Sequence, residues 1–204
     1  MPALFPIFLK LKGRRVLVVG AGKEGESKIA GLLDTGALIR VIALQATEAV
    51  RQWARSGLIE FEERGFITND LGDISLVVVA TSSSIVNEVT FSEAQRRGVL
   101  RNVVDIPDLC DFYYPAVVKR GDLQIAISTS GQSPSLAQRL RQRLEKQFGP
   151  AYADWVKELG ATRREILKST LASEQKRELL HSLASRTAFE AMVAGVLLTR
   201  GDAA

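Results

Sequence analysis

The stretch Val16-Leu-Val-Val-Gly20-Ala-Gly-Lys-Glu-Gly25 joins a short apolar run to three glycines with the spacing G-x-G-x-x-G. Apolar residues at helical spacing follow as far as Asp34, so the segment indicates a strand, a tight turn and a helix. In that context Gly20 permits the turn, Gly22 lets the backbone approach a pyrophosphate, and Gly25 allows the helix to pack closely on the strand. The positive end of the helix favours the phosphate charge. The stretch predicts a dinucleotide-binding loop, and a purely structural glycine turn is the alternative.

Strand and helix patterns alternate from this loop to about residue 104. Leu38–Leu44 and Leu76–Ala80 are apolar runs typical of strands, the second of them fully buried. Further strands are predicted at 58–64 and 101–104, and helices at 47–55 and 85–97. Such alternation is typical of an α/β fold with an open, doubly wound parallel sheet. We therefore predict an N-terminal Rossmann domain over residues 1–112.

The pattern changes near Pro107. Two β-rich runs, Ala116–Arg120 and Leu123–Ser128, flank Gly121-Asp122, which is typical of a hairpin. A polar loop then leads to Ser133, a predicted N-cap, and to a helix that begins at Pro134 and ends near residue 148. A strand pair and one amphipathic helix bury little surface by themselves. We therefore predict a small α+β dimerisation domain over residues 113–149, and a homodimer built by it.

The remaining sequence, from residue 151 to about 198, has a helical pattern. Breaks are expected near Gly160, at 171–173 and at 184–186. This stretch predicts a helical C-terminal domain over residues 150–204.

Composition excludes several classes of protein. The chain has 204 residues, of which 46% are hydrophobic and 25% charged, as in ordinary globular proteins. The single cysteine, Cys110, cannot form an intramolecular disulfide, nor a His/Cys metal cage with the single histidine, His181, so we predict no resident metal. We interpret Cys110 as a buried small hydrophobe and His181 as a surface or interface residue.

Location and partners follow from what the sequence lacks. It shows no signal-peptide pattern and no apolar run of the ~20 residues that span a bilayer, so we expect a cytoplasmic protein and no membrane partner. The net charge of +4 is modest and comes without aromatic stacking platforms, so we expect no nucleic-acid partner.

The second predicted strand bears on the choice of cofactor. An acidic residue about 20 positions after the glycines would hold a ribose 2′-hydroxyl, but the strand ends in Ala43-Leu44-Gln45-Ala46. No arginine follows at once to hold a 2′-phosphate either. We expect NAD rather than NADP, with Leu44 and Gln45 near the adenosine end. Thr81, just after the strand 76–80, completes the predicted cofactor-binding residues.

Asp105 is the candidate catalytic residue. It follows the strand 101–104 and so lies at the carboxyl edge of the sheet, where ligands of open α/β folds bind. A carboxylate there can accept a proton as a general base. A turn-forming aspartate before Ile106-Pro107 is the alternative.

Over about residues 4–146 the chain resembles the precorrin-2 dehydrogenases, which also occur as the dehydrogenase and ferrochelatase module of sirohaem synthases. The motifs that carry the resemblance, besides the glycine loop, are Leu4-Phe-Pro-Ile-Phe-Leu9, Asn102-Val-Val-Asp105, Phe112-x-x-Pro115-Ala, Arg120-Gly-Asp-Leu, Ile127-Ser-Thr-Ser-Gly-x-Ser-Pro134 and Leu136-Ala-x-x-Leu140-Arg.

The resemblance implies oxidation of precorrin-2 to sirohydrochlorin with NAD⁺ as acceptor, and in some members insertion of Fe²⁺ into the product. The key aspartate of the family falls on Asp105, and its nucleotide contacts fall on Lys23, Glu24, Leu44 and Gln45. The expected partners are a small-molecule tetrapyrrole and a second copy of the chain, with Fe²⁺ or Co²⁺ as a further substrate where metal insertion occurs. We expect no uroporphyrinogen methylation by this polypeptide. A binding module that senses NAD without turnover is the alternative function.

Two segments depart from the family pattern. Thr81-Ser-Ser-Ser84 replaces an acidic run that often follows the fourth strand, and Ser130 replaces a glycine before Gly131. Thr129 takes the place of a serine that is modified in some synthases.

The substrate has many carboxylates, which arginine side chains suit well. The predicted substrate-binding residues are Arg120, Ser128, Thr129, Ser133 and Arg139. A solvated helix face is the alternative for the arginines of residues 139–143, and a helix cap is the alternative for the Ser128–Ser133 loop.

Overall fold

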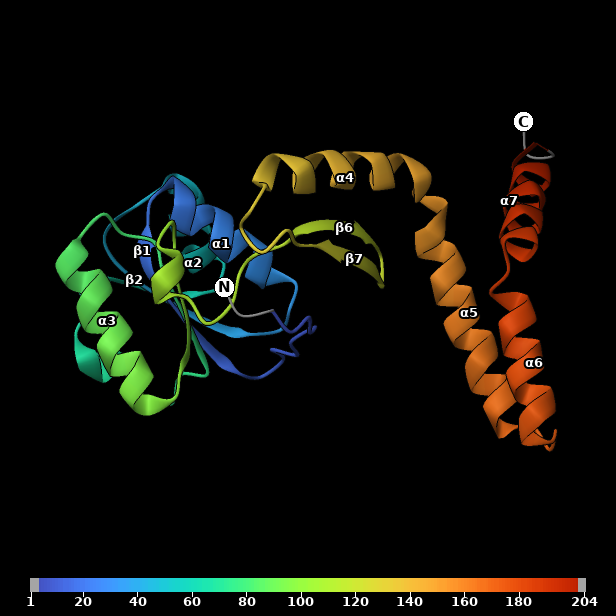
Figure 1. Cartoon of the computed structure of the whole chain (residues 1–204), viewed down its shortest axis with the longest axis horizontal. Coiled ribbons are helices and arrows are strands. Elements are labelled where there is room, and N and C mark those ends of the chain that lie inside the picture. Colours follow the sequence, from blue (N-terminus) through green and yellow to red (C-terminus); the bar gives the residue numbers. More distant parts are fainter. Residues whose placement is uncertain (1–3, 202–204) are drawn as a thin grey trace. The chain divides into compact units, whose positions relative to one another are not determined.

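The computed structural model describes the backbone of residues 4–201 and the side chains of residues 4–195. The chain forms two compact units, Met1–Tyr114 and Pro115–Ala204 (Figure 1). The predicted division into three domains, with borders after residues 112 and 149, stays a prediction.

The first unit is a five-stranded parallel sheet with strand order β3-β2-β1-β4-β5. Its strands are β1 (Arg15–Ala21), β2 (Leu38–Ala46), β3 (Glu60–Glu63), β4 (Leu76–Val79) and β5 (Leu100–Val103). Its helices are α1 (Lys23–Leu33), α2 (Glu48–Arg55) and α3 (Ser84–Arg97), with the 3-10 turns η1 (Thr68–Leu71) and η2 (Pro107–Leu109). The Rossmann prediction is confirmed, since β1 lies between β2 and β4 and the chain reverses its direction of winding there.

Both faces of the sheet are covered, because successive side chains of a strand point to opposite faces. Val16 and Val18 of β1 pack in one cluster with Ile29 of α1 and Val50 of α2. The alternate residues of the same strand pack in a second cluster, which includes Ala94 of α3. Burial of such a side chain is worth ~1.5–3 kcal/mol, so both clusters fix the strand register.

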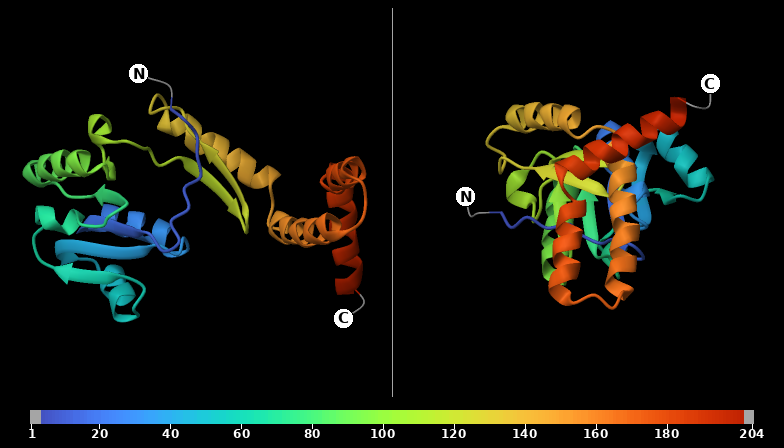
Figure 2. Two further views of the ribbon diagram at one scale, coloured as in Figure 1. Left: turned by 90° about the horizontal axis from the view of Figure 1, so that it is seen from below. Right: turned by 90° about the vertical axis from the view of Figure 1, so that its right-hand side faces the viewer.

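The second unit begins with an antiparallel hairpin of β6 (Ala116–Arg120) and β7 (Leu123–Ile127) around Gly121-Asp122. The helices that follow are α4 (Pro134–Gln147), α5 (Ala151–Lys168), α6 (Ser173–Leu183) and α7 (Arg186–Gly201). Helices α5 and α6 run side by side and are joined by a short turn (Figure 2). Helix α4 packs on the hairpin.

The break expected near Gly160 is wrong, because α5 is one unbroken helix of 18 residues that includes Gly160. A glycine costs a helix only about 1 kcal/mol relative to alanine and removes no hydrogen bond, so a long helix can contain one. The other two predicted breaks are confirmed between α5 and α6 and between α6 and α7.

The second unit has few buried side chains. Among its described residues only Val118, Ala137 and Ile166 are buried. Four rings, those of Phe148, Tyr152, Trp155 and Phe189, form an aromatic cluster between α5 and the start of α7. No helix in the described part of the chain is long and apolar enough to cross a membrane.

Candidate functional site

The three glycines after β1 have different surroundings. Gly20 has φ +101°, and a Cβ placed on it would lie 2.1 Å from the carbonyl oxygen of Ala80. A Cβ on Gly25 would lie 2.1 Å from the carbonyl oxygen of Gly20. Packing of β1, β4 and α1 therefore requires both glycines. At Gly22 the backbone is extended with φ −73°, and a Cβ there would meet no atom within 4 Å. No atom among the described residues requires a glycine at Gly22, which leaves that space for a ligand.

The amino end of α1 is also open. Thr47 and Ser83 cap α2 and α3 by accepting a hydrogen bond from the backbone, whereas the N-cap of α1 is Gly22 and has no side chain to do so. Lys23 and Glu24 in the first turn are exposed. The first N–H groups of a helix lack partners within the helix and attract anions. This open end and the free space at Gly22 together fit the pyrophosphate of a dinucleotide.

The other predicted cofactor residues lie at the same edge of the sheet. Leu44 and Gln45 lie near the carboxyl end of strand β2 itself, not in the loop that follows it. The side chain of Leu44 is 74% exposed. Thr81 lies two residues after the end of β4, and its hydroxyl accepts a hydrogen bond from the N–H of Ser83 at 3.3 Å. Because β2, β1 and β4 are neighbours, their carboxyl ends bring these residues to the two sides of the glycine loop.

Asp105 is exposed and lies just after β5, at the carboxyl edge that carries the glycine loop. Its φ is +64°, in the left-handed region that few residues other than glycine adopt, although Asp and Asn are enriched there. The turn around it is closed by a hydrogen bond of 3.2 Å from the N–H of Ile106 to the carbonyl of Val103. Such backbone costs about 1–3 kcal/mol and often occurs at functional sites.

Two side chains that sequence reasoning did not select hold this turn. The Cys110 thiol lies 3.2 Å from the carbonyl oxygen of Val103 and 3.3 Å from that of Ile106, and can donate to either. The buried Asn102 donates from Nδ2 to Cys110 Sγ at 3.4 Å and to the carbonyl of Phe112 at 2.8 Å. Burial raises the pKa of the Cys110 thiol, so the proton that it donates is retained. The signal in the sequence was the polar Asn102 within an apolar strand.

An ion pair closes the base of the same segment. The guanidinium of Arg101 lies 3.0 Å from the carboxylate of Asp111, and the N–H of Asp111 donates to the carbonyl of Arg101 at 2.8 Å. The chain from Arg101 to Asp111 is therefore a closed loop with Asp105 at its exposed part.

The predicted substrate-binding residues all lie in the second unit. Arg120 is committed to backbone carbonyls, because its guanidinium donates to those of Phe148, Lys119 and Glu145 at 2.8, 2.9 and 3.1 Å. It thereby ties β6 to the end of α4, a role that the sequence did not indicate. Arg139, on α4, is exposed.

The loop before α4 is held by its own hydroxyl groups. The hydroxyls of Ser128 and Thr129 accept hydrogen bonds from the N–H groups of Ser130 and Ser133, each at 3.1 Å. Ser133 caps α4 by accepting from the N–H of Leu136 at 3.3 Å, as predicted. These hydrogen bonds support the interpretation of the loop as a helix cap. Binding of substrate by the loop stays a prediction.

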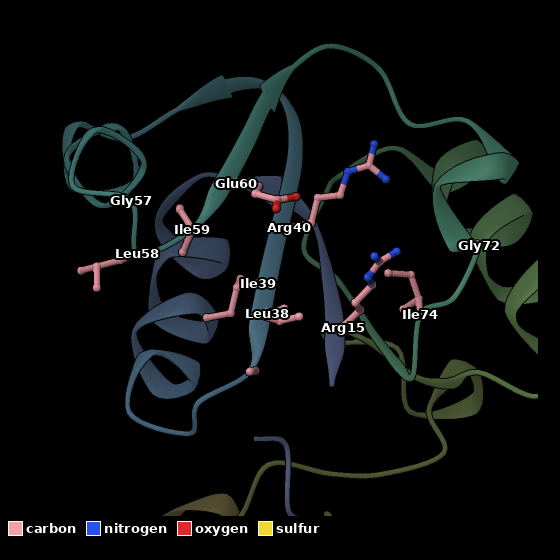
Figure 3. A pocket seen from close by; sticks show the side chains of 11 residues that line it. Arg15, Leu38, Ile39, Arg40, Gly57, Leu58, Ile59, Glu60, Gly72 and Ile74 are labelled. Atoms are coloured by element: carbon pink, nitrogen blue, oxygen red, sulfur yellow. The ribbon is translucent and has the colours of Figure 1, made fainter. Parts of the chain in front are cut away.

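A hollow of about 420 Å³ opens at the opposite, amino-terminal edge of the sheet (Figure 3). Arg15, Leu38 and Glu60, at the starts of β1, β2 and β3, line it together with Arg40 and Leu58. None of the predicted site residues lies in it. Ligands of open α/β sheets bind at the carboxyl ends of the strands, so we assign no function to this hollow.

Arg40, beside this hollow, belongs to an ion-pair network around the buried Asp70. Arg64 donates two hydrogen bonds to the Asp70 carboxylate, at 2.5 and 2.9 Å, and Arg40 lies 3.4 Å from it. Burial raises the pKa of Asp70, but the bonds from Arg64 and from the N–H of Ile67 outweigh it and leave the pKa below its usual value. This network is structural.

The described residues contain no cluster of three or more His, Cys, Asp or Glu side chains that could hold a metal ion.

Comparison with known proteins gives two family matches. Residues 7–116 match a family described as "Putative NAD(P)-binding", and residues 120–147 match one described as "Sirohaem biosynthesis protein central". Together they include the glycine loop, Asp105 and all of α4.

Several relatives are siroheme synthases. One from Methylococcus capsulatus is 38% identical over 172 residues, which cover 84% of this chain and 36% of the relative. Siroheme synthase 2 of Yersinia pestis is 34% identical over 199 residues, which cover 97% of this chain and 42% of the relative. The chain thus spans less than half the length of these curated relatives.

One solved structure is similar along nearly its whole length. The protein titled "SirC, precorrin-2 dehydrogenase" is 29% identical, with a TM-score of 0.82, and the match covers 93% of this chain and 94% of that one.

Proposed function

Because this chain belongs to the NAD(P)-binding family that its residues 7–116 match, we propose that it is a nicotinamide-dependent dehydrogenase that oxidises precorrin-2 to sirohydrochlorin. The observation that carries the choice of substrate is the likeness to SirC, a precorrin-2 dehydrogenase, over more than nine tenths of both chains. The siroheme synthase relatives support the same tetrapyrrole chemistry. We propose the cytoplasm as the location, where a lone cysteine stays reduced.

The nicotinamide cofactor, when bound, supplies the acceptor for the hydride that leaves the tetrapyrrole. The open amino end of α1 and the free space at Gly22 would hold its pyrophosphate, and Leu44 and Gln45 its adenosine end. Thr81, at the same carboxyl edge of the sheet, would also contact the cofactor. All of these residues lie in the first compact unit.

Asp105 is the proposed general base. A carbon–hydrogen bond of the tetrapyrrole breaks with its electron pair leaving as hydride, and the proton released as conjugation extends goes to the Asp105 carboxylate. The side chain is exposed and has no hydrogen bond among the described residues, so it is free to accept the proton. The positively charged Arg139 would attract the carboxylates of the substrate, and Ser128, Thr129 and Ser133 would contact them near the start of α4.

The test is anaerobic single turnover of precorrin-2 with NAD⁺, followed as NADH absorbance. If Asp105 is the base, Asp105→Asn should lower the rate by ~10²–10⁴-fold while NAD⁺ affinity stays nearly unchanged. Asparagine also tolerates the left-handed backbone at this position, so the variant should fold. A near-wild-type rate in folded Asp105→Asn would refute the assigned role.

The same assay decides between the dehydrogenase and a module that senses NAD without turnover. A sensing module would bind NAD⁺ but form no NADH from precorrin-2. Adding Fe²⁺ or Co²⁺ after turnover shows whether the product also accepts a metal.

We also propose NAD rather than NADP as the cofactor, because neither an acidic residue for the ribose nor an arginine for a 2′-phosphate follows at the end of β2. The expected preference in kcat/KM is modest, within about tenfold, since no side chain repels the phosphate. Equal or faster turnover with NADP⁺ would contradict this proposal.

A further inference from the structure

The loop that presents Asp105 depends on few contacts at its exposed part. One backbone hydrogen bond, from Ile106 to Val103, closes the turn, and the left-handed backbone at Asp105 opposes it. The Cys110 thiol touches the carbonyl oxygens of those same two residues, one on each side of Asp105. The turn thus has a second clamp, made by a side chain.

Asn102 holds that clamp in place. Its amide is buried in β5 and donates to Cys110 Sγ and to the carbonyl of Phe112, so the rigid strand sets the position of the thiol. The Arg101–Asp111 ion pair fixes the two ends of the loop but does not reach the turn.

We propose that Cys110, oriented by Asn102, is a positioning residue that keeps the Asp105 carboxylate where it accepts the substrate proton. The inference rests on the proposed role of Asp105. A shift of about 1 Å in a catalytic group can cost ~10²-fold in rate, so loss of the clamp should show in kcat rather than in cofactor binding.

The experiment compares three variants in the single-turnover assay. Cys110→Ala removes the donor and should lower the rate at least about tenfold, with NAD⁺ affinity unchanged by calorimetry. Cys110→Ser keeps a donor and should stay within about threefold of wild type. Val99→Ala is the matched control: it removes buried methyl groups just before β5, away from the turn, and should leave the rate per folded molecule unchanged.

A double variant separates positioning from general destabilisation. In an Asp105→Asn background the base is already absent, so Cys110→Ala should cause no further loss if it acts through Asp105. An equal additional loss in that background would overturn the inference, as would a wild-type rate in folded Cys110→Ala. A wild-type rate in Asp105→Asn alone would instead overturn the proposed base, which keeps the two failures distinct.

Chemical labelling of Cys110 in the wild-type protein tests the same inference if Cys110→Ala does not fold. Cys110 is the only cysteine of the chain, so methyl methanethiosulfonate converts this thiol alone to a methyl disulfide and removes its proton. The rate should fall at least about tenfold and return on addition of dithiothreitol, while Cys110→Ser should not respond. A fully labelled protein with an unchanged rate would contradict the inference.

Discussion

At Gly22 the apo chain would accept a side chain, since a Cβ there meets no atom within 4 Å. Gly22→Asp should therefore fold normally but lose NAD⁺ binding, because its carboxylate would take the place of the pyrophosphate and repel it. Isothermal calorimetry measures the loss, and thermal melting without cofactor should show an unchanged Tm. Micromolar affinity in the variant would contradict the assigned loop.

Gly25→Ala is the contrasting variant. Its Cβ would lie 2.1 Å from the Gly20 carbonyl oxygen, so we expect a lower Tm of the apo protein. If the Tm of the apo protein falls in Gly25→Ala but not in Gly22→Asp, then Gly25 serves folding of the loop and Gly22 serves binding.

Individual residues show how far the sequence could lead. The edge positions of Gly20 and Asp105 followed from the ends of two predicted parallel strands, which the sequence pattern located well. The commitment of Arg120 to three carbonyls could not be predicted, because it depends on where the end of α4 lies relative to β6. The Cys110 clamp was missed for a similar reason, since its partners are backbone atoms without a residue signature.

Among the elements, α4 can be tested through Arg120 of β6, which donates to carbonyls at the carboxyl end of that helix. Arg120→Met removes the donors to Phe148 and Glu145 and should lower the free energy of unfolding by about 2 kcal/mol, or roughly 4–8 °C in Tm. Thermal denaturation checks this. Arg139→Met on the exposed face of the same helix is the control, and should keep the Tm but raise KM for the tetrapyrrole. An unchanged Tm in Arg120→Met would show that its carbonyl contacts stabilise nothing.

The elements themselves were largely predictable. Each strand of the sheet lies within about two residues of its predicted position. Burial on two faces makes β1, β2 and β4 plainly apolar runs, whereas β3 and β5 are more polar. The start of α4 was predicted from Ser133 as its N-cap, and the structure shows Thr47 and Ser83 capping α2 and α3 in the same way. The pattern failed at Gly160, because one glycine costs a helix only about 1 kcal/mol, too little to end the 18-residue α5.

For the whole molecule we propose a homodimer formed through the hairpin and α4. The second unit buries only Val118, Ala137 and Ile166 among its described side chains, while Val117, Leu136 and Leu140 are 37–48% exposed. Three buried residues supply too little hydrophobic free energy for a stable unit, and a second copy would cover the exposed ones. Sedimentation should show a dimer at micromolar concentration.

Leu140→Glu should convert that dimer to a monomer, because it places a charge on the proposed interface. Leu179→Glu on α6 is the matched control: Leu179 is 39% exposed but lies outside the hairpin and α4, so this variant should remain dimeric. Wild-type protein that sediments as a monomer would contradict the proposal.

Because few of the described side chains after residue 115 are buried, the yield of folded protein should depend on how strongly the gene is expressed. If the second unit completes its core only in a pair, newly made chains wait with apolar surface exposed until they meet, and cellular proteases act on them in that interval. Pairing depends on the square of the chain concentration. At low expression, the amount of mature enzyme should therefore rise more steeply than the amount of transcript, and a halved transcript level would cost more than half of the activity.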